Sequence, residues 1–201
     1  NRGLPVTIHR PATVTGHSNT GAWNLDNFLC RLIAGCIDIG KAPIEQMSFD
    51  IVPVDYVSKA IVYLSQQPQV IGKTFHFNNK WPVKSIDIIA WINAFGCPVQ
   101  QVPFAEWREN VTAVTKQSTD HPLYPLLSMF QEDVVGEDKS VEIRKEYSVV
   151  KTEEALLMSG IQCPAADRAL FDAYLSYLQR NGNIAQPTDQ NDFIHSADSR
   201  H

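Results

Sequence analysis

Residues 3–24 of this 201-residue chain read Gly3-Leu-Pro-Val-Thr-Ile-His-Arg-Pro-Ala-Thr-Val-Thr-Gly-His-Ser-Asn-Thr-Gly-Ala-Trp-Asn24, and this stretch decides the fold. The apolar, β-branched segment at residues 4–9 follows a glycine and predicts a short strand entered from a helix. Arg10 and Pro11 end the predicted strand, and the Thr, Gly, Ser and Asn side chains of residues 13–21 predict an irregular loop. Open α/β sheets bind ligands at loops that follow the C-terminal ends of their strands, so this loop is the first candidate for a site.

Downstream of this loop, predicted helices and strands alternate as far as residue 104. Apolar residues at steps of three and four from Asn24 predict a helix that closes near Gly40. After Pro53, a second helix is predicted, with Asp55 placed to cap it. The other predicted elements are strands at residues 47–52, 73–78 and 100–104 and a helix at residues 85–95. Such alternation predicts an α/β fold in which right-handed crossovers produce parallel strand pairs.

The second half of the chain differs from the first. Beyond Ala105 the pattern is mainly helical, and it closes with an amphipathic helix at residues 165–180. The charged residues 131–146 predict an exposed loop, and the polar residues after Gly182 predict a disordered tail. We therefore predict three regions, namely an α/β region at residues 1–104, a helical lobe at 105–182 and a tail at 183–201.

Composition narrows the classes of function. Hydrophobic residues make up 44% of the chain, which allows a sizeable core, and the formal net charge of −5 disfavours nucleic-acid binding. No apolar run approaches the roughly 20 residues that cross a bilayer, so no membrane span is expected. The N-terminus has neither a signal peptide nor an initiating methionine, which indicates a cytoplasmic protein and a piece of something longer.

Cysteine and histidine give no sign of a metal centre. Cys30, Cys36, Cys97 and Cys163 are widely spaced without a zinc pattern, so free thiols in a reducing cytoplasm are expected. The six histidines are scattered as well. We predict no metal site.

Several runs together resemble one family. Residues 3–24 continue into Asp26-Asn-Phe28 and Phe49-Asp-Ile-Val-Pro-Val-Asp-Tyr-Val-Ser-Lys-Ala60, and further matches are Gly72-Lys-Thr-Phe-His-Phe-Asn78, Trp91-Ile-Asn-Ala-Phe-Gly96 and Gly160-Ile-Gln-Cys-Pro164. The chain resembles the C-terminal part of the thioester reductase domains of non-ribosomal peptide and polyketide synthetases, a branch of the extended short-chain dehydrogenase/reductase superfamily. The resemblance implies the C-terminal part of a Rossmann-like fold with a mainly helical lobe for substrate binding and carrier docking.

The resemblance also implies an activity and a cofactor. Such domains use NADPH to reduce a thioester held on a phosphopantetheinyl carrier protein, and they release an aldehyde or an alcohol. In that family a Rossmann half with a glycine-rich phosphate loop and a catalytic Thr or Ser, Tyr and Lys precedes the strand found here at residues 4–10. The chain has no Gly-x-Gly-x-x-Gly run, so we assign no catalytic residue and expect the NADPH site to be completed by a missing N-terminal Rossmann half.

Two groups of site residues carry over from the family. The cofactor-binding group is Arg10, Pro11, Ala12, Thr13 and Val14, in which the backbone of residues 11–14 is implied to face the nicotinamide and Arg10 to brace the loop. Those implied to line the entry for the phosphopantetheine arm and the acyl group are His17, Ser18, Trp23, Asn24 and Phe28. Other roles stay open: Arg10 could form a salt bridge that supports the turn, Trp23 could cover the following helix as part of the core, and His17 could face solvent. Asp50 and Asp55 are expected to cap or brace.

Two residue pairs have or approach the Tyr-x-x-x-Lys spacing of the family's catalytic base. Tyr147 and Lys151 have the spacing, but they follow the Arg-Pro strand instead of preceding it, and the valines between them favour an extended segment. Tyr56 and Lys59 are one residue short. We assign neither pair a catalytic role.

Two other functions stay open on the sequence alone. The first is an extended-family epimerase or dehydratase acting on nucleotide sugars, against which the Thr-Gly-Ala-Trp-Asn run at residues 20–24 argues. The second is a non-catalytic module that docks a carrier protein. An upstream glycine-rich strand-loop-helix in the same reading frame would separate an enzyme from such a module.

Overall fold

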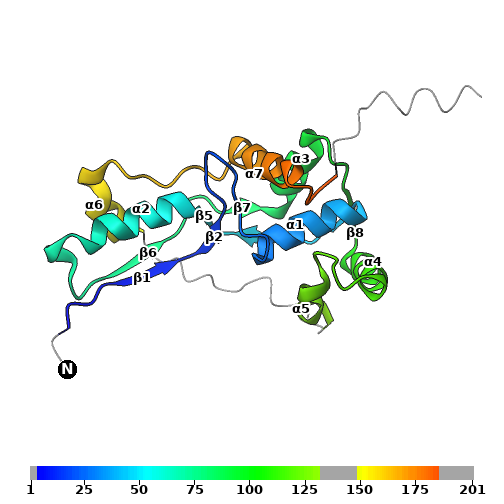
Figure 1. The fold of residues 1–201 in the computed structure, drawn as a ribbon, viewed down its shortest axis with the longest axis horizontal. Coiled ribbons are helices and arrows are strands. Elements are labelled where there is room, and N and C mark those ends of the chain that lie inside the picture. The colour runs from blue at the N-terminus through cyan, green and yellow to red at the C-terminus, as the bar shows by residue number, and fades with distance from the viewer. Residues whose placement is uncertain (1–3, 132–148, 186–201) are drawn as a thin grey trace, which may run out of the picture.

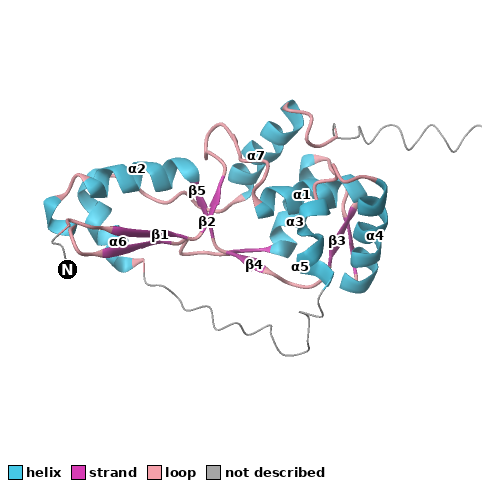
Figure 2. Cartoon of the chain, turned by 60° about the horizontal axis from the view of Figure 1, so that its bottom comes forward, coloured by secondary structure: helices cyan, strands magenta, loops and turns pink. Residues whose placement is uncertain are grey.

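The computed structural model of the chain describes residues 4–131 and 149–185. These residues form an elongated molecule in which short strands are spread along the length and helices surround them (Figures 1 and 2). None of the helices in the described ranges combines the length and the apolar character needed to cross a bilayer.

The strands pair two by two. Three pairs are parallel: β1 (Ile8–Pro11) with β6 (Thr74–Phe77), β2 (Thr13–Thr15) with β5 (Ile51–Pro53), and β3 (Lys41–Pro43) with β8 (Gln100–Val102). The fourth pair, β4 (Ser48–Phe49) with β7 (Val83–Lys84), is antiparallel. At least one helix separates the two strands of each parallel pair along the chain, as a parallel crossover requires. The predicted α/β class and the predicted parallel pairing are confirmed.

Capping residues set the ends of the helices that matter most for the site. Helix α1 (Phe28–Ile39) begins where the Asn27 side chain accepts hydrogen bonds from the amides of Leu29 and Cys30, and it ends at Gly40, whose φ of 66° is left-handed. Asp167 caps α7 (Arg168–Arg180) through the amide of Leu170. The remaining helices are α2 (Val54–Ser65), α3 (Ser85–Phe95), α4 (Phe104–Gln117), α5 (Leu127–Gln131) and α6 (Val150–Leu156), with 3-10 turns η1 (Pro68–Val70), η2 (Tyr124–Leu126) and η3 (Leu157–Ser159).

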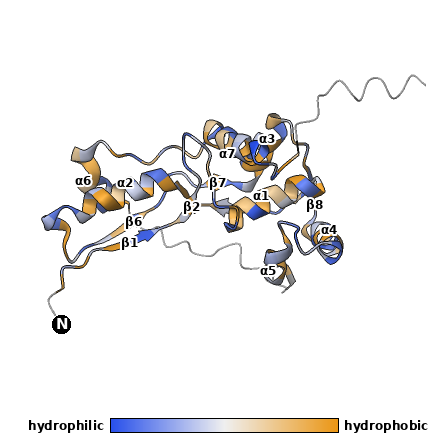
Figure 3. Cartoon of the chain, in the orientation of Figure 1, coloured by the Kyte–Doolittle hydropathy of each residue, from blue (hydrophilic) through white to orange (hydrophobic). Residues whose placement is uncertain are grey.

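Two clusters of buried apolar side chains hold these elements together. The larger cluster joins α1, α3, α4 and α7, and its members include Leu29, Ile92, Trp107, Phe171 and Tyr174. The smaller cluster joins α2, β5, β6 and α6, and its members include Val52, Leu64, Phe75, Phe77 and Leu156. Figure 3 shows the matching pattern, in which α1 and α2 each carry both apolar and polar faces. Helix α6 thus packs in one cluster and α7 in the other, and the division of the chain at residues 104 and 105 stays a prediction.

The first strand is shifted relative to its predicted bounds. It begins at Ile8 instead of Leu4, and it runs through Arg10 and Pro11 instead of ending there. In the parallel ladder, the amides of residues 8 and 12 donate to carbonyls on the β6 side. Alternate residues donate in such a ladder, so the proline, which has no N–H, stands where no donor toward β6 is required.

Other predicted boundaries also need correction. The segment predicted as an irregular loop contains β2, and the helix predicted from Asn24 begins at Phe28 because Asn27 supplies the cap. The strand predicted at residues 47–52 is split into β4 and β5. Val150, expected to be extended, begins α6. Ile184, inside the predicted tail, is buried in the larger cluster, whereas residues 186–201 and most of the loop predicted at 131–146 lie outside the described ranges.

Candidate functional site

The β2–α1 loop, residues 16–27, leaves the sheet at the C-terminal ends of the parallel pair β2–β5. Its tip is tightly folded, because the amide of His17 donates to the carbonyl of Ala22 and the amide of Gly21 donates to the carbonyl of His17, both at 2.9 Å. Gly21 has a φ of 72°, which side chains other than glycine rarely adopt. The loop therefore has a defined shape at the sheet edge where α/β proteins bind ligands.

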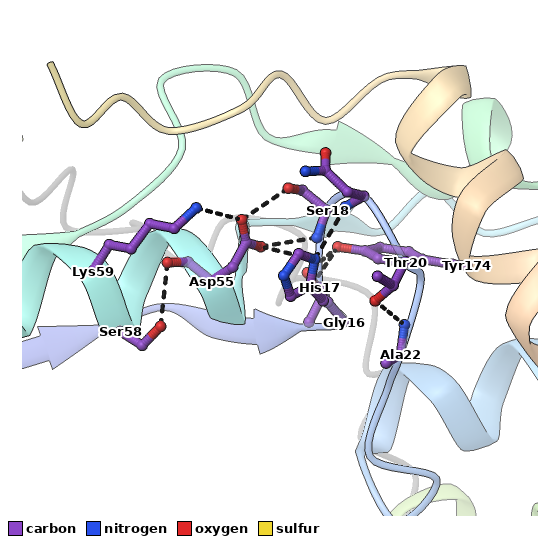
Figure 4. A network of polar contacts seen from close by, with 11 residues as sticks. Gly16, His17, Ser18, Thr20, Ala22, Asp55, Ser58, Lys59 and Tyr174 are labelled. Atoms are coloured by element: carbon purple, nitrogen blue, oxygen red, sulfur yellow. Dashed lines mark hydrogen bonds and ion pairs between the residues drawn. The ribbon is translucent and has the colours of Figure 1, made fainter.

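Helix α2 holds this loop through Asp55. The carboxylate accepts a hydrogen bond from the amide of Ser18 at 2.8 Å and another from its hydroxyl at 2.9 Å (Figure 4). Lys59, one turn further along α2, places its Nζ 3.5 Å from Oδ2, and Nδ1 of His17 lies 3.9 Å from Oδ1. Of the two roles expected for Asp55, the cap is wrong, because α2 has no side-chain cap, and the brace is confirmed, because the carboxylate holds the loop.

The Asp55 carboxylate carries its charge at neutral pH. Burial by itself raises its pKa, but the hydrogen bonds from Ser18 and the nearby imidazole of His17 lower it, and the resulting pKa lies below the ordinary 3.8. Its place in the first turn of α2 also favours a negative charge. The charge strengthens both hydrogen bonds from Ser18.

Helix α7 holds the loop from the other side. The hydroxyl of Tyr174 donates to the carbonyl of Gly16 at 3.0 Å and lies 2.8 Å from the hydroxyl of Thr15. A Cβ on Gly21 would stand 2.0 Å from the carbonyl oxygen of Ala173, so only glycine allows this approach of the loop to the helix. Near the end of α7, Arg180 donates to the carbonyl of Thr20 at 3.3 Å. Burial raises the pKa of Tyr174, which keeps its hydroxyl a neutral donor.

The predicted substrate residues divide between the surface and the core. Ser18 is engaged by Asp55, the half-exposed His17 accepts a hydrogen bond from the amide of Asn19, and Asn24 is exposed. Trp23 is only 6% exposed and belongs to the larger cluster, with its ring centroid 4.6 Å from that of Tyr174. Phe28 is partly buried against the same cluster. Trp23 thus lies where the core alternative places it, and the substrate roles of all five residues stay predictions.

Residues 10–14, predicted to bind the cofactor, run from β1 into β2, and Ala12 and Val14 pack against the smaller cluster. The amides of Ala12 and Thr13 already donate to the carbonyls of Phe77 and Asp50, so these two donors are not free for a cofactor. Arg10 is exposed and forms no ion pair with another residue of the described part, so the salt bridge considered for it is not found there. The cofactor roles of residues 10–14 stay predictions, and the chain contains no glycine-rich loop to hold a pyrophosphate.

Asp50 braces the neighbouring strand end, as one of its two expected roles. Its carboxylate accepts from the side-chain amide of Asn78 at 2.6 Å and from the backbone amide of Asn79 at 2.8 Å. The side chain of Asn79 in turn donates to the carbonyls of Ile51 and Pro164. This network fixes the chain as it leaves β6.

The two Tyr–Lys pairs stay without a catalytic assignment. Burial raises the pKa of Tyr56, which is the opposite of what a general base needs, and Lys59 is paired with Asp55. Tyr56 borders a cavity of about 490 Å³ behind α2, whose lining includes Trp81 and Cys163 but no residue predicted for cofactor or substrate. Tyr147 lies outside the described residues.

The cysteines are free thiols, as predicted. Burial raises the pKa of Cys30 to about 11 and that of Cys36 to about 12, so both stay protonated near neutral pH. Among the described residues, no group of three or more His, Cys, Asp and Glu side chains is placed to hold a metal ion.

Sequence reasoning did not identify Tyr174 as part of the site. It lies on the apolar face of α7, and its only signal is that a buried tyrosine needs a partner for its hydroxyl. That partner, Gly16, is 158 residues away along the chain. The contact of Arg180 with Thr20 spans 160 residues and carries no local signal either.

The chain is similar in sequence to known synthetases and in fold to a solved R domain. An NAD-binding family described as "Male sterility protein" matches residues 1–61. The "Non-canonical nonribosomal peptide synthetase FrzA" of Cladobotryum sp is 34% identical over 90% of the chain, which spans 18% of that synthetase. The solved terminal R domain from the myxalamid PKS-NRPS biosynthetic pathway is 38% identical, with a TM-score of 0.76 over 93% of the chain and 47% of that domain.

A further solved structure shows the same fold. It is a thiolation-reductase di-domain from an archaeal non-ribosomal peptide synthetase, with 22% identity and a TM-score of 0.66 over 90% of the chain and 37% of that structure. The chain thus covers less than half of each of these two solved structures. By sequence and by fold, the chain is similar to part of the terminal R domain of a PKS-NRPS pathway and to part of a non-ribosomal peptide synthetase.

Proposed function

We propose that the chain is the substrate-side portion of an NADPH-dependent thioester reductase domain. The complete domain would release a carrier-bound acyl or peptidyl thioester as an aldehyde, or as an alcohol after a second reduction. The observation that carries this proposal is the β2–α1 loop, which α2 and α7 hold in one shape at the C-terminal ends of parallel strands. Rigid support of this kind is what a binding site requires of its scaffold.

The reaction sets what this chain has to provide. One thioester, one NADPH and one proton give one aldehyde, one thiol and one NADP⁺, and the cofactor supplies the hydride. We assign proton transfer and polarisation of the carbonyl to upstream residues. The exposed amide of Asn24 and the imidazole of His17 offer hydrogen-bonding groups to the amides of a phosphopantetheine arm. Residues 10–14 would form the wall beside the nicotinamide.

The same proposal assigns the regions and the partners. Residues 1–104 would complete the Rossmann-like sheet with an upstream half, residues 105–182 would form the lobe that selects the acyl group and docks the carrier, and residues 183–201 would be a tail. The partner would be a phosphopantetheinyl carrier protein, and the solved di-domain that pairs thiolation with reductase supports this choice. We propose a cytoplasmic location.

A reconstituted reaction tests the proposal. The complete reductase domain is mixed with a carrier protein loaded with an acyl thioester, and NADPH oxidation and the released product are followed by absorbance and mass spectrometry. Oxidation of NADPH with release of an aldehyde or alcohol supports the proposal, and a carrier loaded through an amide bond is the matched control. Carrier binding without turnover would favour a docking module, and conversion of a nucleotide sugar would favour an epimerase or dehydratase. Either of these results would refute the thioester reductase.

A further inference from the structure

Asp55 is a buried carboxylate that neither the proposed chemistry nor the fold of α2 uses. It is 9% exposed, although a carboxylate loses much of its hydration on burial and needs strong compensation. It does not cap its helix, and it directly precedes Tyr56 and Val57, which pack in the smaller cluster. Both of its oxygens are directed at the β2–α1 loop, where they bind the amide and the hydroxyl of Ser18 (Figure 4).

We propose that Asp55 is a positioning residue that fixes residues 17–20 of the β2–α1 loop through Ser18 and thereby sets the affinity of the domain for its carrier-bound thioester. The inference rests on the proposed function, because it takes this loop as the lining of the thioester entry. It gives Asp55 no contact with substrate.

Different contacts hold the two halves of the β2–α1 loop, and residues 17–20 depend mainly on Asp55. On the α7 side, Gly21 packs against the backbone of Ala173 and Trp23 is buried against Tyr174, so the second half of the loop is held by packing. Residues 17–20 carry polar side chains and are exposed or only partly buried. Apart from bonds within the loop and one from Arg180 to Thr20, their hold comes from the Asp55 carboxylate.

The charges around Asp55 favour a fixed arrangement over a titrating switch. His17 faces it from the loop and Lys59 from α2, and no other acidic side chain in the described part forms an ion pair with either. Lys59 is 63% exposed and forms a surface ion pair with Asp55, which contributes little to stability. The Ser18 hydrogen bonds, which are charge-assisted and partly buried, are the stronger hold.

The test uses the complete reductase domain with a thioester-loaded carrier. Asp55→Ala should raise KM about tenfold, the factor expected when the competent loop conformation falls to about one tenth of the population, with kcat changed less than about threefold. Hydrogen exchange of the amides of Ser18 and Gly21 should become faster, while that of Leu29, bonded to the Asn27 cap, should not change. Asp87→Asn is the matched control, since Asp87 is an exposed carboxylate in the first turn of α3, as Asp55 is in the first turn of α2, and lies outside the loop.

Graded variants separate positioning from general damage. Asp55→Asn keeps an acceptor for the Ser18 amide and Ser18→Ala removes only the hydroxyl bond, so each should raise KM less than Asp55→Ala does. The double variant Asp55→Ala/Ser18→Ala should be no worse than Asp55→Ala alone, because the same interaction is already lost. If Asp55→Ala does not fold, the two milder variants still give the KM and exchange readouts.

Several results would overturn the inference about Asp55. An unchanged KM and unchanged exchange of the Ser18 amide in Asp55→Ala would overturn the inference, and so would an equal rise of KM in Asp87→Asn. A fall of kcat by a hundredfold at constant KM would instead make Asp55 a catalytic residue and also overturn it. If the wild-type domain reduces no thioester, the proposed function fails, and the hydrogen exchange measurement still decides whether Asp55 fixes the loop.

Discussion

Replacing Trp23 by alanine should destabilise the chain severely. The indole is 6% exposed inside the larger cluster and lies 4.6 Å from the ring of Tyr174, centroid to centroid. Truncation of a buried tryptophan costs about 3–5 kcal/mol, of which about 0.5–1.5 kcal/mol comes from the lost aromatic pair. For a domain of this size each kcal/mol lowers the melting temperature by about 2–4 °C, so we expect a fall of about 6–20 °C.

Two further variants make the assay specific. Trp23→Phe keeps an aromatic ring against Tyr174 and removes an indole N–H that has no hydrogen-bond partner in the described part of the chain, so its cost should be well under half that of Trp23→Ala. Trp81→Ala is the surface control: Trp81 is 78% exposed, and its loss should change stability by no more than about 0.5 kcal/mol. Thermal unfolding followed by circular dichroism measures all three.

The result that refutes this reasoning is a Trp23→Ala variant that melts within a few degrees of the wild type, as Trp81→Ala should. Trp23 would then contribute little to packing, and the alternative role at the acyl entry would gain support. Trp23→Phe in the complete domain then decides that role, because it allows KM for the carrier-bound thioester to be measured on a folded protein.

Three other changes have definite expected outcomes. Gly35→Ala should lower the free energy of unfolding in urea by about 1–3 kcal/mol, because the added Cβ would lie 2.2 Å from Cγ of the buried Leu123, and an unchanged midpoint would contradict this packing. The pKa of Asp55 in the folded chain lies below its ordinary value of 3.8, so the stability that its charge contributes is complete above pH 3.8 and is lost as the pH falls through the lower pKa. The stability of Asp55→Asn should therefore fall less steeply on acidification than that of the wild type. Parallel stability profiles of the two proteins would contradict a stabilising role of the Asp55 charge. Calorimetric titration of this chain alone with NADPH should show no micromolar binding, because the glycine-rich loop is absent, and such binding would contradict the proposed division of the site.

The sequence predicts those parts of the fold whose determinants are local. Helix α3 was predicted with its observed bounds, because its apolar period and the terminal Gly96 lie within a few residues of each other. The start of α1 was placed too early, since Asn24 and Asn27 are both good capping residues and only the folded chain shows that Asn27 binds the first amides. Strand β2 has the composition of a loop, and it becomes a strand because it pairs with Ile51–Pro53. Pairing of that kind is tertiary and leaves no local pattern.

The sequence was enough to locate the candidate site, but not to predict which side chains contact one another in it. The position of the loop after a strand, together with its composition, was enough to select it. Asp55 and Ser18 are 37 residues apart, so the capping rule, which depends only on neighbouring residues, gave Asp55 the wrong partner. The burial of Trp23 was equally hidden, because it depends on α7, whose Tyr174 covers it from the far end of the chain.

The β2–α1 loop also connects the two hydrophobic clusters. Asp55 reaches it from the helix of the smaller cluster and Tyr174 from a helix of the larger one. Separate cores tend to open as separate cooperative units with their own free energies. A ligand that binds the loop in its folded shape would therefore stabilise both clusters at once.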